Sequence, residues 1–151
     1  MIGYFDTSAV VPLVIAEPTS DRCAQAWQAC DVRVSSLLLI AEAHAALAQA
    51  LRLGRLTESQ HRRALVLLER RLGELDLVTP DRAMAVSAGA LALQHSMRGY
   101  DALHAATALA LQAEDLVAVA GDQDLLAAWQ AMGLAVINTD QAANTTESAQ
   151  S

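Results

Sequence analysis

Five short apolar runs, separated by helix-like segments, constrain the fold of this chain more than any other feature. Each run is three to five residues long, which suits a buried strand and is too short for a helix. The runs cover residues 2–5, 32–34, 75–78, 116–120 and 134–137. Strands that are apolar on both sides and alternate with helices are typical of a parallel sheet covered on both faces. We therefore predict an α/β fold: a three-layer α/β/α sandwich with a central parallel sheet of about five short strands.

The segments between the strands carry helix start signals. Residues 57–60 form a capping box, and residues 79–81 (Thr-Pro-Asp) are predicted to start a helix with proline in its first position. Ser8 is expected to cap the first helix, and Ser35 or Ser36 to cap a long apolar one. The predicted helices span residues 8–16, 20–29, 36–53, 58–72, 80–94, 100–112 and 123–132.

A chain of 151 residues suits a single domain. We place that domain at residues 1–138, because residues 139–151 hold no large apolar side chain and are predicted to form a disordered polar tail. The N-terminal segment MIGYFDTSAV lacks the positive charge of a signal peptide, and no apolar run reaches the length of a membrane span. A cytoplasmic protein is expected.

The charge balance limits how the chain can handle phosphate. Its net charge is −7, and all ten basic residues are arginines. The absence of lysine excludes mechanisms that need a lysine at a phosphate or in a Schiff base. An acidic protein has no general attraction for nucleic acid, so a function on RNA requires bound metal or a local arginine patch. Six arginines lie within residues 52–71, where they either contact phosphates or occupy the solvated faces of two helices.

Two acids follow predicted strands directly. Asp6 comes after the first strand, and Asp122 after the strand at residues 116–120. Each could cap the helix that follows or bind a metal, although Ser8 is available as a cap for the first helix. Because the carboxyl ends of parallel strands meet at one edge of the sheet, Asp6 and Asp122 are expected on the same rim.

Two further acids stand out by their position on helices. Glu42 lies in the apolar helix SLLLIAEAHAALAQAL, where no cation stands three or four residues away, so it either faces solvent or is buried with a partner. Asp101 follows a glycine at the start of a helix, where an acid is also favoured by the helix dipole. His104, three residues later, lies on nearly the same helical face and is expected to pack or to support a neighbouring residue.

Together, Asp6, Glu42, Asp101 and Asp122 suggest an acidic cluster. Close carboxylates repel one another, so such a cluster needs a bound cation or retained protons. Hard oxygen ligands favour Mg²⁺ or Mn²⁺ over zinc. Such ions lower the pKa of a bound water and neutralise charge on a phosphate.

Three stretches of this sequence resemble PIN domains: YFDTSAVVPLVIAEP, RGYDALHAATAL and GDQDLLAAWQAMGLAVI. With the helix that carries Glu42, they are most similar to VapC, the ribonuclease toxin of VapBC toxin–antitoxin modules, over residues 1–137. The resemblance implies metal ligation by Asp6, Glu42 and Asp101, with Asp122 completing the cluster directly or through water. It also implies an endoribonuclease that hydrolyses RNA with a metal-activated water, a homodimer, and a VapB-type antitoxin that covers the site. Thr7 and Ser8 match the small polar pair of the family and are expected to support the ligands.

One departure from the family pattern leaves an alternative open. The family often carries Thr or Ser two residues before its fourth acid, and here that position is Ala120. A catalytically silent module that binds RNA or a protein is therefore the main rival hypothesis. A haloacid-dehalogenase-like phosphatase also has an Asp after its first strand, but it needs a second Asp where Ser8 stands and a lysine that this chain lacks.

Overall fold

The computed structural model describes residues 1–111 and 113–141, and these residues form a five-stranded parallel sheet between two layers of helices. The strands lie in the order β3-β2-β1-β4-β5, and every neighbouring pair is parallel. The predicted α/β fold and the number of strands are confirmed. The strands are β1 (Ile2–Phe5), β2 (Val32–Ser36), β3 (Asp76–Val78), β4 (Leu116–Ala120) and β5 (Ala135–Asn138).

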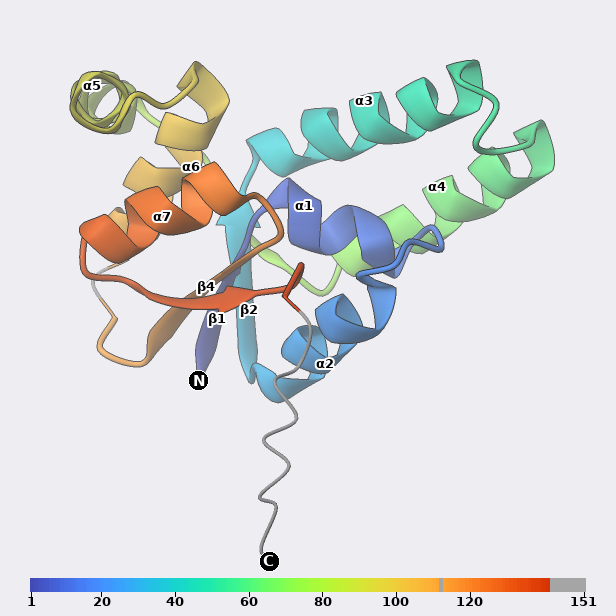
Figure 1. Ribbon diagram of the computed structural model, residues 1–151, viewed down its shortest axis with the longest axis horizontal. Helices are drawn as coiled ribbons and strands as arrows, with labels where there is room; N and C mark the ends of the chain where they lie inside the picture. Colours follow the sequence, from blue (N-terminus) through green and yellow to red (C-terminus); the bar gives the residue numbers. More distant parts are fainter. Residues whose placement is uncertain (112, 142–151) are drawn as a thin grey trace, which may run out of the picture.

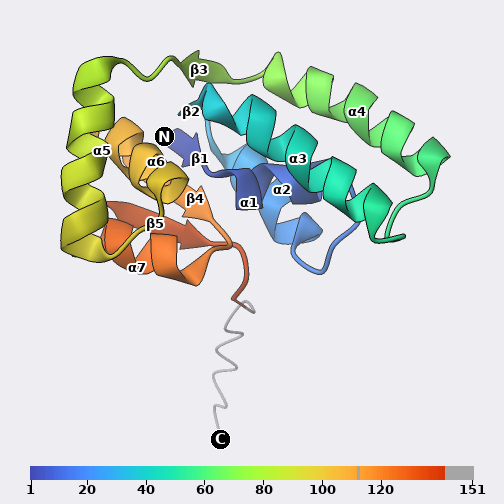
Figure 2. The ribbon, with the colours of Figure 1, turned by 90° about the horizontal axis from the view of Figure 1, so that it is seen from above.

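Seven α-helices and one 3₁₀ helix in the described residues supply the outer layers (Figure 1). The elements of one layer are α1 (Thr7–Val10), the 3₁₀ helix η1 (Val11–Leu13), α2 (Ser20–Ala29), α3 (Leu38–Arg52) and α4 (Glu58–Leu72). The elements of the other layer are α5 (Arg82–His95), α6 (Gly99–Ala110) and α7 (Gln123–Ala131). Figure 2 shows α3 and α4 side by side as one arm, with α5, α6 and α7 gathered at the opposite end.

Alternate residues of the central strands pack into two separate hydrophobic cores, one on each face of the sheet. Val117 and Val119 of β4 pack with Phe5 against the layer of α1 to α4, whereas Leu116 and Ala118 face α6 and α7. Because both of its faces are buried, β4 reads as a continuous apolar run in the sequence, whereas β2, β3 and β5 also carry charged or polar residues. The three predicted layers follow from this division.

The two tryptophans lie in the cores on opposite faces of the sheet. Trp27 of α2 is 4% exposed and packs against Phe5, with ring centroids 4.9 Å apart. Trp129 of α7 is fully buried and meets Tyr4 edge to face, with centroids 5.9 Å apart. Since Tyr4 and Phe5 are consecutive residues of β1, this one strand anchors both layers.

Strand β1 also approaches the end of α2 closely at Gly3. A Cβ atom added there would lie 2.4 Å from the Cys30 sulfur and 2.6 Å from the Phe5 ring. Both distances are below van der Waals contact, so this position in the sheet requires glycine. The approach brings β1 and α2 together beneath the loop that carries Asp6.

Several predicted helix boundaries are wrong, each for a local reason. The first helix does not run to residue 16: the regular helix ends at Val10 and a 3₁₀ turn follows, because Pro12 has no N–H to donate to the preceding turn. Proline is not in the first position of α5. Asp81 caps that helix by accepting a hydrogen bond from the Met84 N–H (2.8 Å), which leaves Pro80 outside it. The predicted end of α6, Gln112, lies outside the described residues.

The long apolar helix α3 also begins later than predicted. Ser35 and Ser36 belong to β2, and Leu37 is the N-cap residue, although the Ser36 hydroxyl accepts a hydrogen bond from the Leu38 N–H at the start of the helix (3.3 Å). The Ser35 hydroxyl instead donates to the Phe5 carbonyl of the neighbouring strand (2.6 Å). The capping box at residues 57–60 is confirmed, with both reciprocal hydrogen bonds present. The other boundaries agree within two residues, the usual uncertainty of helix and strand ends.

Thr139, the first residue of the predicted tail, packs with the domain. It is fully buried, and its N–H donates to the Ala120 carbonyl (2.9 Å), which continues the pairing of β4 and β5. Residues 142–151 lie outside the described residues, so disorder of the tail stays a prediction. Within the described part of the chain, none of the helices has the length and apolar character needed to cross a membrane.

Candidate active site

The loops that follow β1 and β4 meet at the carboxyl edge of the sheet. These two strands are paired, and the strand order reverses direction between them, which is where parallel sheets commonly place their sites. The Asp6 N–H donates to the Val119 carbonyl (3.0 Å), and the Gly121 N–H donates to the Ser8 hydroxyl (2.9 Å). The structure thus places Asp6 and Asp122 on one rim, as their positions after the strands predict.

Asp6 caps α1, a role that the sequence analysis assigned to Ser8. Its Oδ2 accepts hydrogen bonds from the N–H (2.9 Å) and the hydroxyl (2.6 Å) of Ser8. Ser8 therefore supports the carboxylate and is not the cap. Asp122 caps α7 in the same way, accepting from the Leu125 N–H (3.0 Å). In both acids a single oxygen makes the capping bond, so capping and metal binding are compatible roles.

Glu42 is half-buried and has a partner that lies far away in the sequence. The Nε2–H of His104 donates to Glu42 Oε1 (2.6 Å), and the Thr7 hydroxyl donates to the same oxygen (3.1 Å). His104 is fully buried, with its Nδ1 at 2.8 Å from the Tyr4 hydroxyl and its Nε2 at 3.7 Å from Asp6 Oδ1. A buried chain of side chains from β1 through α6 to α3 thus fixes Glu42 beside Asp6.

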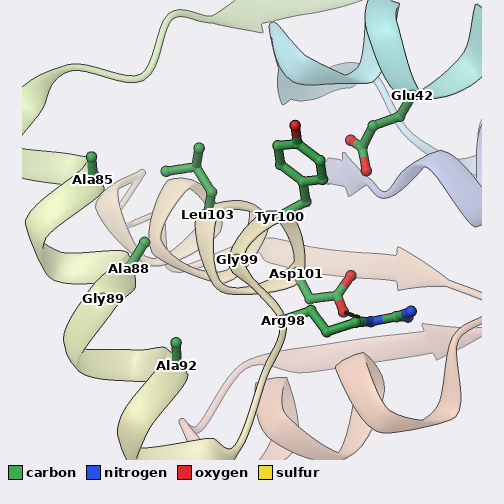
Figure 3. A pocket seen from close by; sticks show the side chains of 10 residues that line it. All are labelled: Glu42, Ala85, Ala88, Gly89, Ala92, Arg98, Gly99, Tyr100, Asp101 and Leu103. Carbon is green, nitrogen blue, oxygen red and sulfur yellow. Dashed lines mark hydrogen bonds and ion pairs between the residues drawn. The ribbon is translucent and has the colours of Figure 1, made fainter.

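Arg98 joins the other two acids. Its Nε lies 3.2 Å from Asp101 Oδ2, and its Nη2 lies 4.0 Å from Asp122 Oδ2. Figure 3 shows Arg98 and Asp101 side by side at the start of α6, with Glu42 next to the ring of Tyr100. The Arg98 side chain is 85% exposed, so this ion pair is open to solvent and stabilises the fold little.

The site is strongly negative. Burial raises the pKa of Asp101, and the charges of Asp122 and Asp6 raise it further in spite of the bond to Arg98. Burial by itself would lower the pKa of His104, but the hydrogen bond with Glu42 and the charges of Asp6, Glu42 and Asp101 outweigh it, and the pKa is raised. The neighbouring carboxylates contribute to both shifts, although burial is the largest cause for Asp101 and opposes the shift of His104.

The donor chemistry of this edge fits a hard divalent cation. Its exposed donors are carboxylate oxygens, the ligand type that Mg²⁺ and Mn²⁺ favour. Within residues 1–111 and 113–141, however, no three Asp, Glu, His or Cys side chains are gathered closely enough to hold an ion together. The four acids are instead divided into two pairs, Asp6 and Glu42 at His104, and Asp101 and Asp122 at Arg98.

We expect replacement of His104 by leucine to destabilise the protein. The buried Tyr4 hydroxyl and the Glu42 carboxylate both lose a partner, at a cost of about 1–3 kcal/mol in the free energy of unfolding. Urea unfolding in EDTA measures this loss. The double variant Tyr4→Phe/His104→Leu, which removes both ends of one bond, should lose less than the sum of the two single variants. Strictly additive losses would contradict the coupling of Tyr4 to His104.

Two of the six arginines between residues 52 and 71 form ion pairs within the protein. Arg62 pairs with Glu58 on an exposed face, and Arg71 pairs with Glu74 and stacks on Trp27. Arg52 at the end of α3 lines a hollow that also contains Glu42, whereas Arg55 and Arg63 line a separate hollow. The sequence analysis missed Arg98, although its spacing of three residues before Asp101 is that of a helical ion pair and could have revealed it.

Ala120, the residue that departs from the family pattern, is fully buried. It lies in the core formed with Leu125 and Trp129, on the face of the sheet that α6 and α7 cover. Its methyl group therefore contributes to packing in this protein.

Comparison with known proteins agrees with this architecture. The sequence pattern of the PIN-domain family matches residues 3–128. Ribonuclease VapC49 of Mycobacterium tuberculosis is 38% identical over 137 residues, which cover 88% of this chain and 92% of that protein. Among solved structures, PAE2754 from Pyrobaculum aerophilum superposes with a TM-score of 0.69 at 21% identity and covers 93% of this chain and 90% of its own. A toxin–antitoxin complex from Klebsiella pneumoniae gives a TM-score of 0.63 at 18% identity, with 91% and 97% covered.

A parallel sheet of this strand order, with acids at its carboxyl edge and helices on both faces, is the architecture of a PIN-like α/β/α protein. The chain belongs to the PIN-domain family, and within it to the group of the VapC proteins.

Proposed function

We propose that this protein is an endoribonuclease toxin that hydrolyses phosphodiester bonds in RNA with the help of Mg²⁺ or Mn²⁺. The observation that supports the proposal is that two pairs of acids, Asp6 with Glu42 at His104 and Asp101 with Asp122 at Arg98, come from separate elements around the carboxyl ends of β1 and β4. The relative named ribonuclease VapC49, which matches most of the chain, supports the choice of reaction.

Each acid has a role in this proposal. Asp6, Glu42 and Asp101 hold the ion, and Asp122 completes the cluster directly or through water. A bound divalent cation supplies positive charge to the phosphate and lowers the pKa of a water molecule. His104 keeps the Glu42 carboxylate turned toward Asp6, and Thr7 and Ser8 hold Glu42 and Asp6 through their hydroxyls. Hydrogen bonds of this kind orient ligands and raise the affinity for metal.

We also propose a VapB-type antitoxin as the partner, a homodimer as the assembly and the cytoplasm as the location. The structural similarity to the Klebsiella pneumoniae complex supports an antitoxin partner. The net charge of −7 favours a basic partner surface. Co-purification with the product of an adjacent antitoxin gene, followed by light scattering, tests the first two points.

Removal of metal is expected to stop the reaction. Purified protein incubated with total cellular RNA should give discrete fragments in Mg²⁺ or Mn²⁺ and none in EDTA, because the carboxylates alone repel the phosphate. Restoring metal to the EDTA sample should restore the same fragments. Cleavage that persists in EDTA would contradict a metal-dependent nuclease.

A catalytically silent module that binds RNA or a protein is the second candidate. Two observations favour it: the residue at position 120 lacks a hydroxyl, and no three ligands are gathered in the described residues. If this candidate is correct, the protein should bind labelled RNA but release no cleavage fragments from the same substrates when Mg²⁺ or Mn²⁺ is present.

A further inference from the structure

A hollow of about 620 Å³ lies between α5 and α6 and opens at the acidic edge (Figure 3). Its walls are made of small and apolar side chains on one side and of Glu42 and Asp101 on the other. Volume and lining are those of a ligand pocket with a few polar groups at its mouth. The α5 and α6 residues that form its apolar walls are Ala85, Ala88, Gly89, Ala92 and Leu103.

Tyr100 stands at the mouth of this hollow. Its side chain is 63% exposed, in the first turn of α6 directly before Asp101. A second hollow, of about 820 Å³ along α3, shares Glu42, Arg98 and Tyr100 with the first. The exposed ring thus separates two hollows that both reach the acids. Figure 3 shows it between Leu103 and Glu42.

Gly89 in the middle of α5 lines the same hollow. A Cβ atom added at this position meets no atom within 4 Å, so packing within the domain does not require glycine. Glycine weakens a helix relative to alanine. A larger side chain at position 89 would therefore extend into the open space of the hollow.

We propose that the α5–α6 hollow binds one unstacked nucleobase of the RNA, stacked on the ring of Tyr100, with Arg98 contacting the adjoining phosphate. This inference rests on the proposed function, because it places the base beside the phosphodiester that the proposed metal site would hydrolyse with water. The occupant follows from the combination at the mouth, where an exposed aromatic ring and an exposed guanidinium adjoin an apolar hollow and the carboxylates. A nucleotide combines a flat base with an anionic phosphate. Proteins recognise single-stranded RNA by stacking its unpaired bases on aromatic rings.

Binding of short single-stranded RNA tests the proposal separately from cleavage. The parent protein is Asp6→Asn in Mg²⁺, and the probes are fluorescein-labelled hexaribonucleotides of adenosine, cytidine and uridine at low ionic strength. We expect Tyr100→Ala to weaken binding of the best probe about 10-fold, and Tyr100→Phe, which keeps the ring, to restore it. In a second series of probes, an abasic nucleotide replaces each nucleotide of the hexamer in turn. We expect only one of these replacements to weaken binding to the parent, and we expect the same replacement to have no effect on binding to Tyr100→Ala.

Filling the hollow gives an independent test with a matched control. Gly89→Leu is expected to weaken binding by about the same factor, because its side chain enters open space in the hollow. Ala90→Leu adds leucine one residue away, at an exposed position outside the hollow, and should leave binding unchanged. Urea unfolding should show that neither leucine destabilises α5.

Three results would overturn the proposal. The first is equal binding by the parent, Tyr100→Ala and Gly89→Leu, and the second is no binding of any probe by either the parent or wild-type protein in Mg²⁺. The third is a change of oligomeric state in Gly89→Leu on light scattering, which would show that the hollow receives a protein surface. If the parent binds the probes as expected but wild-type protein cleaves no RNA, the proposed nuclease activity fails while the base pocket stands.

Discussion

Asp6→Asn is expected to abolish metal-dependent cleavage of RNA while leaving the fold intact. Asn is isosteric with Asp, and as an N-cap residue it is about as favourable, so the hydrogen bond from the Ser8 N–H to position 6 can persist. The substitution removes the negative charge of the carboxylate, whose Oδ1 faces His104 and the other acids. Loss of a group that merely orients a metal ligand commonly costs about 10–100-fold in affinity or activity, so loss of a ligand should exceed about 100-fold.

Asp101→Asn should have the same effect, because Asp101 lies across the same edge and is the acid that Arg98 holds. Initial rates on one RNA substrate, together with Mn²⁺ affinity by calorimetry, measure both variants. Asp124→Asn is the matched control: Asp124 is also in the first turn of a helix at this end, but it is exposed and lies outside the cluster. Unchanged cleavage by either variant, with Asp124→Asn equally active, would remove that residue from the proposed site.

Trp129→Ala is expected to cost about 3–5 kcal/mol of unfolding free energy. Trp129 is fully buried between α7 and the sheet, and it packs edge to face on Tyr4. Its removal leaves a large cavity against a strand that cannot collapse into it, because β1 is paired on both sides. Chemical denaturation measures the change. Leu93→Ala, at a side chain that is 88% exposed, should change the stability by less than about 0.5 kcal/mol.

The same substitution should also affect the site. Tyr4 contacts both Trp129 and His104, and His104 holds Glu42, so loosening of Tyr4 should move the carboxylate. We therefore expect the fraction of Trp129→Ala that stays folded to bind Mn²⁺ more weakly than wild-type protein. A loss of stability below about 1 kcal/mol would contradict the view that this core fixes α7 to the sheet.

The layered fold could be predicted because its signals are local. A short apolar run that is bounded by helix start signals indicates a buried strand, and a cap such as residues 57–60 acts within one helical turn. Position after a strand also predicts which acids share an edge, since all carboxyl ends of a parallel sheet lie together. Asp6 and Asp122 could therefore be assigned to one rim from the sequence.

The sequence does not decide which of two neighbouring side chains caps a helix. Asp6 and Ser8 both suit an N-cap, and only the backbone path after β1 decides that Asp6 accepts the bond and Ser8 donates. Likewise, Asp81 rather than Pro80 sets the start of α5, because its carboxylate reaches the Met84 N–H. Such choices depend on dihedral angles that a residue type does not fix.

By itself, the sequence determined the α/β class, the order of the elements along the chain and the placement of Asp6 and Asp122 at one edge, because each depends on residues a few positions apart. The tertiary structure decided how these acids are held. Glu42 meets His104 across 62 residues and Tyr4 meets His104 across 100, contacts that exist because α3, α6 and β1 pack at one place. The division of the acids between His104 and Arg98, and the hollow beside Tyr100, arise in the same way. Helix packing brings together side chains whose separation along the chain carries no local signal.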